Sequence, residues 1–276
     1  MGAEVGHTLT EQKLSVTAVT AGRSERTVAR ARAAGIAPVA TLEALIGGSD
    51  VVLSIVPPGS ALEVAGQIAA AMRAARRAPT FVDANAISPA TARRVAETIE
   101  DAGGRYVDGG IVGGPPTIGR ETSLYLSGPG GEQLVDPLTT PELRVVWIGG
   151  DPTAASSLKM AYAAWSKGST ALLLAIRALA QHQGVEAALL EQWRRSQPDV
   201  LARSNAAARV SARAWRWSDE MDEIARTFED AGLPGGAAAA AARLYERMAS
   251  YKDVDDPPPL DDVLAAVLSP PQAASA

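Results

Sequence analysis

Up to Ile148, short apolar or β-branched runs alternate with stretches of helical periodicity, and after Gly149-Gly150 only helical stretches follow. This alternation constrains the fold most, because strands separated by helices of this length pair in parallel through crossover helices. We therefore expect an α/β domain with a mostly parallel sheet over 1–149 and an all-α domain over 150–252. The remaining residues, 253–276, are rich in Pro and Asp, and we expect this tail to be partly disordered.

Each expected element is bounded by capping or turn residues. The expected strands span 14–21, 51–56, 80–83, 106–108, 123–127 and 144–148. The helices of the first region span 24–34, 41–46, 62–76 and 89–102, with Ser24 and Ser88 as N-caps. In the second region we expect one long helix over 151–183, then helices over 186–196, 198–209, 219–231, 237–250 and 260–268.

The composition narrows the functional classes. A net charge of -5 gives no electrostatic reason to expect a nucleic-acid or membrane partner. Without cysteine there is no disulfide or thiolate nucleophile, and the two histidines, His7 and His182, lie too far apart in sequence to suggest a metal site. We find no secretory signal and no apolar run of about 18 residues. We therefore expect a soluble cytoplasmic protein that is long enough to bury a substantial core.

The N-terminus carries part of a dinucleotide-binding pattern. Rossmann-type domains open with an apolar strand and a Gly-x-Gly-x-x-Gly turn, whose amides hold a pyrophosphate at a helix N-terminus. Gly2 and Gly6 fit the last two glycines of a three-spacer variant, but the first glycine and the preceding strand are missing. An ordinary flexible N-terminus is the alternative. Residues elsewhere could fill the gap, but we expect a truncated or wrongly started version whose neighbouring strand has an unpaired edge. Its NADP affinity should rise when about ten apolar residues and a glycine are restored upstream.

The second expected strand ends in Gly22-Arg23-Ser24, where dinucleotide-binding domains read the adenosine ribose. An acidic residue at this point would select NAD. A cation and a hydroxyl, Arg23 and Ser24, suit the 2'-phosphate of NADP instead. We expect NADP in preference to NAD, the alternative being that Arg23 is a solvated surface charge.

Lys159 stands on an otherwise apolar stretch of the long helix. Burying an ammonium group without a partner is costly, so the side chain either snorkels to water or works in a cleft. In a cleft beside a nicotinamide ring, a lysine can give or take a proton.

Together these pieces resemble the 6-phosphogluconate dehydrogenase-like and β-hydroxyacid dehydrogenase superfamily. The resemblance is greatest to the branch with a helical C-terminal domain of unknown function, and it reaches to about residue 250. Its anchors, in order, are Gly22-Arg23-Ser24, Ser54-Ile55-Val56-Pro57-Pro58, the stretches 82–89 and 108–116, and the lysine helix.

The resemblance implies a role for several residues. Val56, Pro57 and Pro58 match the loop along the cofactor, and Asn85 matches a position near the nicotinamide and substrate. Gly113 and Gly114 match a turn whose amides hold the substrate's acid group, and Lys159 matches the general acid or base. The superfamily also implies a homodimer in which the long helix packs against its partner.

Two departures affect the substrate site. Val112 stands where the superfamily often has serine, and Ala163 stands where it usually has a substrate-binding asparagine. The lost polar partners would weaken binding of a standard substrate. Tyr162, Trp165 and Lys167 would reshape the pocket, and Lys167, which shares a helix face with Lys159, would attract an anionic group. A packing role for Lys167 is the alternative.

We therefore expect an NADP-dependent oxidoreductase that transfers hydride between nicotinamide and a small hydroxy acid or its carbonyl counterpart. Two alternatives stay open. The stretch 108–128 also resembles imine reductases, although those usually carry Asp or Tyr at the position of Lys159. The missing strand, Val112 and Ala163 instead favour a non-catalytic NADP-binding or scaffold protein.

Overall fold

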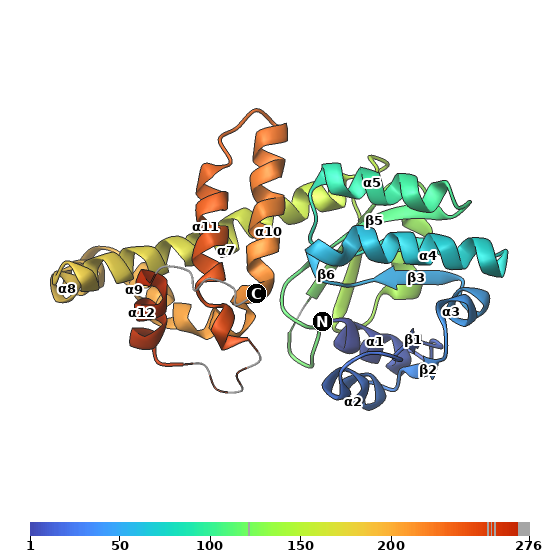
Figure 1. Cartoon of the computed structure of the whole chain (residues 1–276), viewed down its shortest axis with the longest axis horizontal. Coiled ribbons are helices and arrows are strands. Elements are labelled where there is room, and N and C mark those ends of the chain that lie inside the picture. The colour runs from blue at the N-terminus through green and yellow to red at the C-terminus, as the bar shows by residue number, and fades with distance from the viewer. Residues whose placement is uncertain (121, 253, 255, 257, 270–276) are drawn as a thin grey trace, which may run out of the picture. The chain divides into compact units, whose positions relative to one another are not determined.

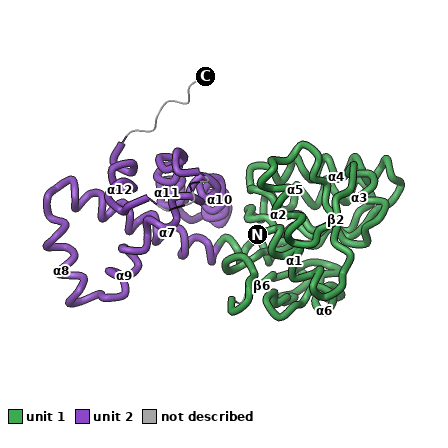
Figure 2. The backbone as a smooth tube through the Cα atoms, turned by 90° about the horizontal axis from the view of Figure 1, so that it is seen from below, with its two compact units in different colours: residues 1–160 green, residues 161–276 purple. Residues whose placement is uncertain are grey.

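In a computed structural model of the chain, residues 1–120, 122–252, 254, 256 and 258–269 are described. The chain divides into two compact units, Met1–Met160 and Ala161–Ala276 (Figure 2). The division lies inside one long helix, α7 (Ala154–His182). The last part of the tail, for which disorder is expected, lies outside the described residues. No helix in the described part of the chain is long and apolar enough to cross a membrane.

Unit 1 is an α/β domain, as the sequence predicts (Figure 1). Its strands are β1 (Thr17–Val19), β2 (Ala37–Val39), β3 (Val51–Ser54), β4 (Thr80–Asp83), β5 (Arg105–Val112), β6 (Thr122–Ser127) and β7 (Leu143–Trp147). Its helices before α7 are α1 (Gly2–Glu11), α2 (Glu25–Ala33), α3 (Leu42–Gly48), α4 (Ala61–Ala75), α5 (Pro89–Glu100) and α6 (Val135–Leu138). Short 3₁₀ turns precede α4 and α6.

The strands form two separate sheets. β1 and β2 pair in parallel, while the other five strands are ordered β3-β4-β5-β6-β7. In the described residues no strand joins β1 to β3, so each of these strands has one unpaired edge. In a doubly wound sheet this is the place of the central first strand.

Both faces of the five-stranded sheet are buried. Because side chains alternate along a strand, Phe81 and Tyr106 face the core made with α3, α4 and α5. Their neighbours Val82 and Val107 face the other side, where they join a core with Val5 of α1. Burial on both faces is typical of sheets that helices cover.

Unit 1 differs from the expected pattern in several details. β5 and β6 are antiparallel, because the connection between them is too short for a crossover helix. The N-terminus is helical, and both Gly2 and Gly6 lie within α1. The strand expected over 14–21 shortens to β1, and β2, whose central residue is Pro38, was missed. Ser24 and Ser88 are confirmed as N-caps, since their hydroxyl oxygens accept from Thr27 N and Thr91 N.

Unit 2 is helical, as expected. After α7 come α8 (Glu186–Ser196), α9 (Pro198–Ala206), α10 (Ser211–Asp230), α11 (Gly236–Glu246) and α12 (Leu260–Leu268). α10 begins eight residues before the expected start at Asp219. α10 and α11 lie side by side and antiparallel in Figure 1.

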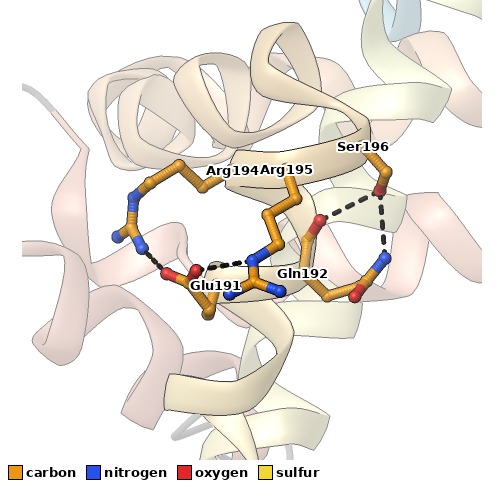
Figure 3. A network of polar contacts seen from close by, with 5 residues as sticks. All are labelled: Glu191, Gln192, Arg194, Arg195 and Ser196. Carbon is orange, nitrogen blue, oxygen red and sulfur yellow. Dashed lines mark hydrogen bonds and ion pairs between the residues drawn. The ribbon is translucent and has the colours of Figure 1, made fainter.

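Polar contacts inside unit 2 differ in their weight. On α8, Glu191 accepts from both Arg194 and Arg195, and Gln192 contacts Ser196 (Figure 3). These side chains are exposed, so each pair contributes well under about 1 kcal/mol to stability. Arg177 by contrast is buried, and it joins three segments by binding Glu186, Ser204 and Asn205.

Candidate functional site

Asn85 holds together the carboxyl ends of β3 and β4. Its side chain is buried; Nδ2 donates to Ser54 Oγ at 3.0 Å, and Oδ1 accepts from Val56 N at 2.6 Å. Its backbone N–H donates to Asp83 Oδ1 at 3.1 Å. Asn85 and the loop from Val56 to Pro58 are therefore brought together, and the amide of Asn85 fixes where that loop starts.

Lys159 lies against the end of β5. Its half-buried side chain extends along unit 1, and Nζ donates to Ile111 O at 2.7 Å. α7 crosses β5 very closely, because a Cβ on Gly110 would lie 2.7 Å from Ala155 O and 3.1 Å from Lys159 Cβ. A side chain at position 110 would push the helix away, so the glycine explains how the amine reaches this edge of the sheet.

The first turn of α7 is bound by a buried carboxylate that the sequence analysis did not single out. Asp108, in the middle of β5, accepts from Ser156 N at 2.8 Å, Ser156 Oγ at 2.6 Å and Ser127 Oγ at 3.1 Å. Tyr106 OH adds a contact at 3.4 Å. Burial raises the pKa of Asp108, while the hydrogen bonds from Ser156 and Ser127 oppose that rise. An acidic residue inside an apolar strand was the available signal.

Asp83 is the neighbour of Asp108 across the sheet, in register with it. Its side chain is 1% exposed, and Oδ2 has no hydrogen-bond partner in the described part of the chain. Burial, together with the nearby charge of Asp108, raises the pKa of Asp83 to about 7, although the Asn85 N–H opposes this. Asp83 therefore titrates near neutral pH beneath the Asn85 loop.

Gly113 and Gly114 form the start of the β5–β6 connection. Gly113 has φ +112°, a conformation that L side chains rarely adopt. A Cβ on Gly114 would lie 2.6 Å from Arg120 Nη1, and Gly114 O accepts from Thr122 Oγ1 at 2.7 Å. The exposed guanidinium of Arg120 thus lies beside the glycine pair, a cation that the sequence analysis did not single out.

The expected cofactor residues at the N-terminus lie on two elements. Gly2 opens α1 next to Ile55, where a Cβ would be 3.9 Å from Ile55 Cβ, so the helix N-terminus lies beside the loop of Val56. Gly6 is needed for packing, since a Cβ there would meet Ile36 Cδ1 at 2.5 Å. Arg23 is exposed in the turn between β1 and α2, which Ser24 caps. A helix N-terminus and an exposed cation are each groups that fit a phosphate.

Within unit 2, Lys167 forms an ion pair with the carboxylate of Glu220. Its ammonium also lies 5.3 Å from the centre of the Trp217 ring, and its backbone carbonyl accepts from Tyr245 OH. The pair is largely buried, which favours the packing role for Lys167 over attraction of a substrate anion, because its charge is compensated inside the helical unit. Tyr162 is 49% exposed, and Ala163 is buried.

A groove of about 810 Å³ on unit 1 runs between α1, the end of α2 and the tip of the β5–β6 connection. None of the predicted site residues lines it. Among the described residues, no group of three or more acidic or histidine side chains could hold a metal ion.

Comparison with known proteins identifies both parts of the chain. Residues 1–137 match the family described as the NAD binding domain of 6-phosphogluconate dehydrogenase, and residues 180–248 match a domain of unknown function, DUF1932. An uncharacterized 28.5 kDa protein of Methanothermus fervidus is 30% identical over 193 residues, which are 68% of this chain and 72% of that protein.

Solved structures share the fold at low identity. The 3-hydroxyisobutyrate dehydrogenase of Mycobacterium tuberculosis is 18% identical, with a TM-score of 0.70 over 98% of this chain and 96% of that one. An imine reductase of Streptomyces aurantiacus is 20% identical, with a TM-score of 0.56 over 96% and 95%. The chain therefore belongs to the 6-phosphogluconate dehydrogenase-like family of pyridine-nucleotide-binding oxidoreductases, in the branch that carries the helical domain of unknown function.

Proposed function

We propose that this protein is an NADP-dependent oxidoreductase that interconverts a small hydroxy acid and its carbonyl counterpart, with Lys159 as general acid and base. One observation carries the proposal: the amine of Lys159 donates to Ile111 O, at the sheet edge where Asn85 and the loop of Val56 also lie. Ligands of open α/β sheets bind outside the carboxyl ends of the strands.

The cofactor would be held by residues of unit 1. The N-terminus of α1, opened by Gly2 and packed through Gly6, would face the pyrophosphate, and Arg23 with Ser24 would bind the 2'-phosphate of NADP. Val56, Pro57 and Pro58 would line the nucleotide, with Asn85 fixing their position. When bound, the nicotinamide would supply the hydride chemistry.

Lys159 would move the proton. When a hydroxyl carbon is oxidised, its oxygen must lose a proton, and the reverse reaction must return one. Nζ has the chemistry for both, because an ammonium group can give a proton and the amine can take one back. The carbonyl contact restrains the ammonium group near the carboxyl edge of the sheet.

An anionic substrate group would be bound by the backbone amides at Gly113 and Gly114, and the neighbouring Arg120 adds positive charge there. Val112 and Ala163 supply no polar partner, so the preferred substrate would lack the groups that serine and asparagine bind. This favours a substrate that differs from the superfamily's common hydroxy acids.

The test is the Lys159→Ala variant, with Lys252→Ala as the matched control. Lys252 lies over the ring of Trp215 within unit 2, and it is not one of the proposed site residues. We expect Lys159→Ala to lower kcat by about a hundredfold or more, the range for losing a general acid or base, while NADPH affinity stays the same. Full turnover by Lys159→Ala would refute the role. The assay follows NADPH absorbance with a panel of 2- and 3-oxo acids.

A second candidate is imine reduction, which the resemblance of 108–128 favours and the fold accommodates. The same panel extended with cyclic imines distinguishes the two, since turnover of imines but not of oxo acids would favour it. NADPH binding without any turnover would favour the non-catalytic alternative.

A homodimer through α7 is part of the proposal. Trp165, Leu172 and Leu179 recur every seven residues on this helix, with exposed fractions of 67%, 60% and 57%. Large apolar side chains exposed along one helical stripe are typical of an interface with another helix.

A further inference from the structure

The hydrogen bonds around Asp108 connect three elements of unit 1 at one buried point. Asp108 comes from β5, Ser127 from the end of β6 and Ser156 from the first turn of α7. All three side chains are at most 1% exposed. Ser127 Oγ donates to Asp108 Oδ2 and accepts from Ala155 N at 3.0 Å. It therefore links the carboxylate to the backbone of α7 through two hydrogen bonds.

These contacts satisfy backbone donors at the start of α7. The first N–H groups of a helix have no partner within the helix, and here Ala155 N and Ser156 N are bound by side chains of the sheet. Burying such donors without acceptors would be costly, so the first turn of α7 has one favoured position against β5 and β6. The close approach at Gly110 fixes its height above the strand.

Lys159 follows from this turn. Ala155 and Lys159 are four residues apart and therefore lie on the same side of the helix, which is the side that meets Gly110. Any displacement of the first turn moves the Cβ of Lys159, and with it the contact between Nζ and Ile111 O.

We propose that Asp108, Ser127 and Ser156 form a positioning cluster, called the Asp108 cluster, that sets where the amine of Lys159 lies. The inference rests on the proposed function for its effect on turnover, but the placement of the amine can be tested without it. None of the three side chains needs to touch a substrate, so they are positioning residues rather than catalytic ones.

A carboxylate is the group that this point requires. Ser156 N, Ser156 Oγ and Ser127 Oγ all donate to Asp108, and a carboxylate accepts at both oxygens. In the Asp108→Asn variant, one of the two oxygens becomes an amide nitrogen that points its own hydrogens at a donor. The Asp108 cluster would lose at least one hydrogen bond, while the volume of the side chain at position 108 stays nearly unchanged.

The experiment compares Asp108→Asn, Ser127→Ala and Ser156→Ala with Ser157→Ala. Ser157 lies on the same turn of α7, but its hydroxyl donates to Thr153 O of the same helix at 2.9 Å and the residue is exposed. Circular dichroism checks the folding of each variant. If Asp108→Asn does not fold, the two serine variants, which each remove a single hydroxyl, still test the proposal.

The first readout is independent of activity. Reductive ¹³C-methylation labels the amines of the intact protein, and the signal of Lys159 is assigned by its absence from Lys159→Arg. We expect this signal to shift and broaden in the three variants of the Asp108 cluster but not in Ser157→Ala. The signals of Lys13 and Lys252 should stay in place. An unchanged Lys159 signal in folded variants of the Asp108 cluster would overturn the proposal.

The second readout is kinetic. We expect kcat to fall by about tenfold to a hundredfold in the variants of the Asp108 cluster, which is the usual cost of losing a residue that positions a reactive group. Their NADPH affinity should stay within about twofold of the wild-type value. The pH profile of kcat should also change shape. If Lys159→Ala is inactive and the variants of the Asp108 cluster keep full kcat, the positioning role is refuted. If Lys159→Ala is fully active, the proposed function fails, and the ¹³C signal alone decides the placement.

Discussion

Asp83 makes the stability of unit 1 depend on pH in the direction opposite to that of an ordinary aspartate. Its folded-state pKa of about 7 lies above the ordinary aspartate value of 3.8. Between these two values the native state keeps a proton that the unfolded chain has released. The stabilisation is therefore fully present below about pH 4, and it is lost as the pH rises toward 7.

The size of the effect follows from the two pKa values. They differ by about 3 pH units, and each unit corresponds to 1.36 kcal/mol, so the full effect is about 4 kcal/mol. Between pH 5 and pH 8 about 3 kcal/mol of it should be visible, because only the interval from 5 to 7 contributes.

The perturbation is Asp83→Asn. The amide has the shape of the protonated acid and keeps an oxygen for the N–H of Asn85, but it does not titrate. We expect the free energy of unfolding of the wild type to fall by about 3 kcal/mol more than that of the variant between pH 5 and pH 8. The matched control is Asp50→Asn, whose side chain is exposed and bound to Arg77 at the surface.

Urea unfolding followed by far-ultraviolet circular dichroism at pH 5, 6, 7 and 8 measures these free energies. Wild type, Asp83→Asn and Asp50→Asn are compared at the same ionic strength. Parallel curves for wild type and Asp83→Asn would refute the reasoning, since they would mean that Asp83 is ionised in the native state throughout this range.

Three further predictions concern packing, cofactor choice and assembly. Gly110→Ala should destabilise the protein by at least about 1–3 kcal/mol in thermal unfolding, because its Cβ would meet Ala155 O at 2.7 Å. Gly66→Ala, on an open face of α4, should instead stabilise it by about 0.5–1 kcal/mol, and the reverse order would contradict the packing argument. Arg23→Ala should weaken NADP binding about tenfold in fluorescence titrations and leave NAD binding unchanged. An equal loss for both nucleotides would argue against a 2'-phosphate contact. Leu172→Asp should shift the mass measured by light scattering from dimer toward monomer, whereas Leu233→Asp, an exposed leucine between α10 and α11, should not.

Some features of the candidate site could be predicted from the sequence, and others could not. Asn85 and the Val56 loop could be predicted as neighbours, because both follow strands of one parallel sheet and therefore meet at one edge. The role of Asp108 could not, since its partners Ser127 and Ser156 are 19 and 48 residues away. Lys167 shares a helix with Lys159, and only the packing of α10 shows that Glu220 neutralises it.

By itself, the sequence determined most of the elements and their order. β4, α8 and α12 have the expected bounds, and Ser24 and Ser88 cap the expected helices. These features depend on hydrogen bonds and periodicities within a few residues, which a local pattern contains. Only the tertiary structure decided the direction of β6 and the position of the Lys159 amine. Each of those depends on contacts between distant segments, where burial and unsatisfied donors select one arrangement among several that the local sequence allows.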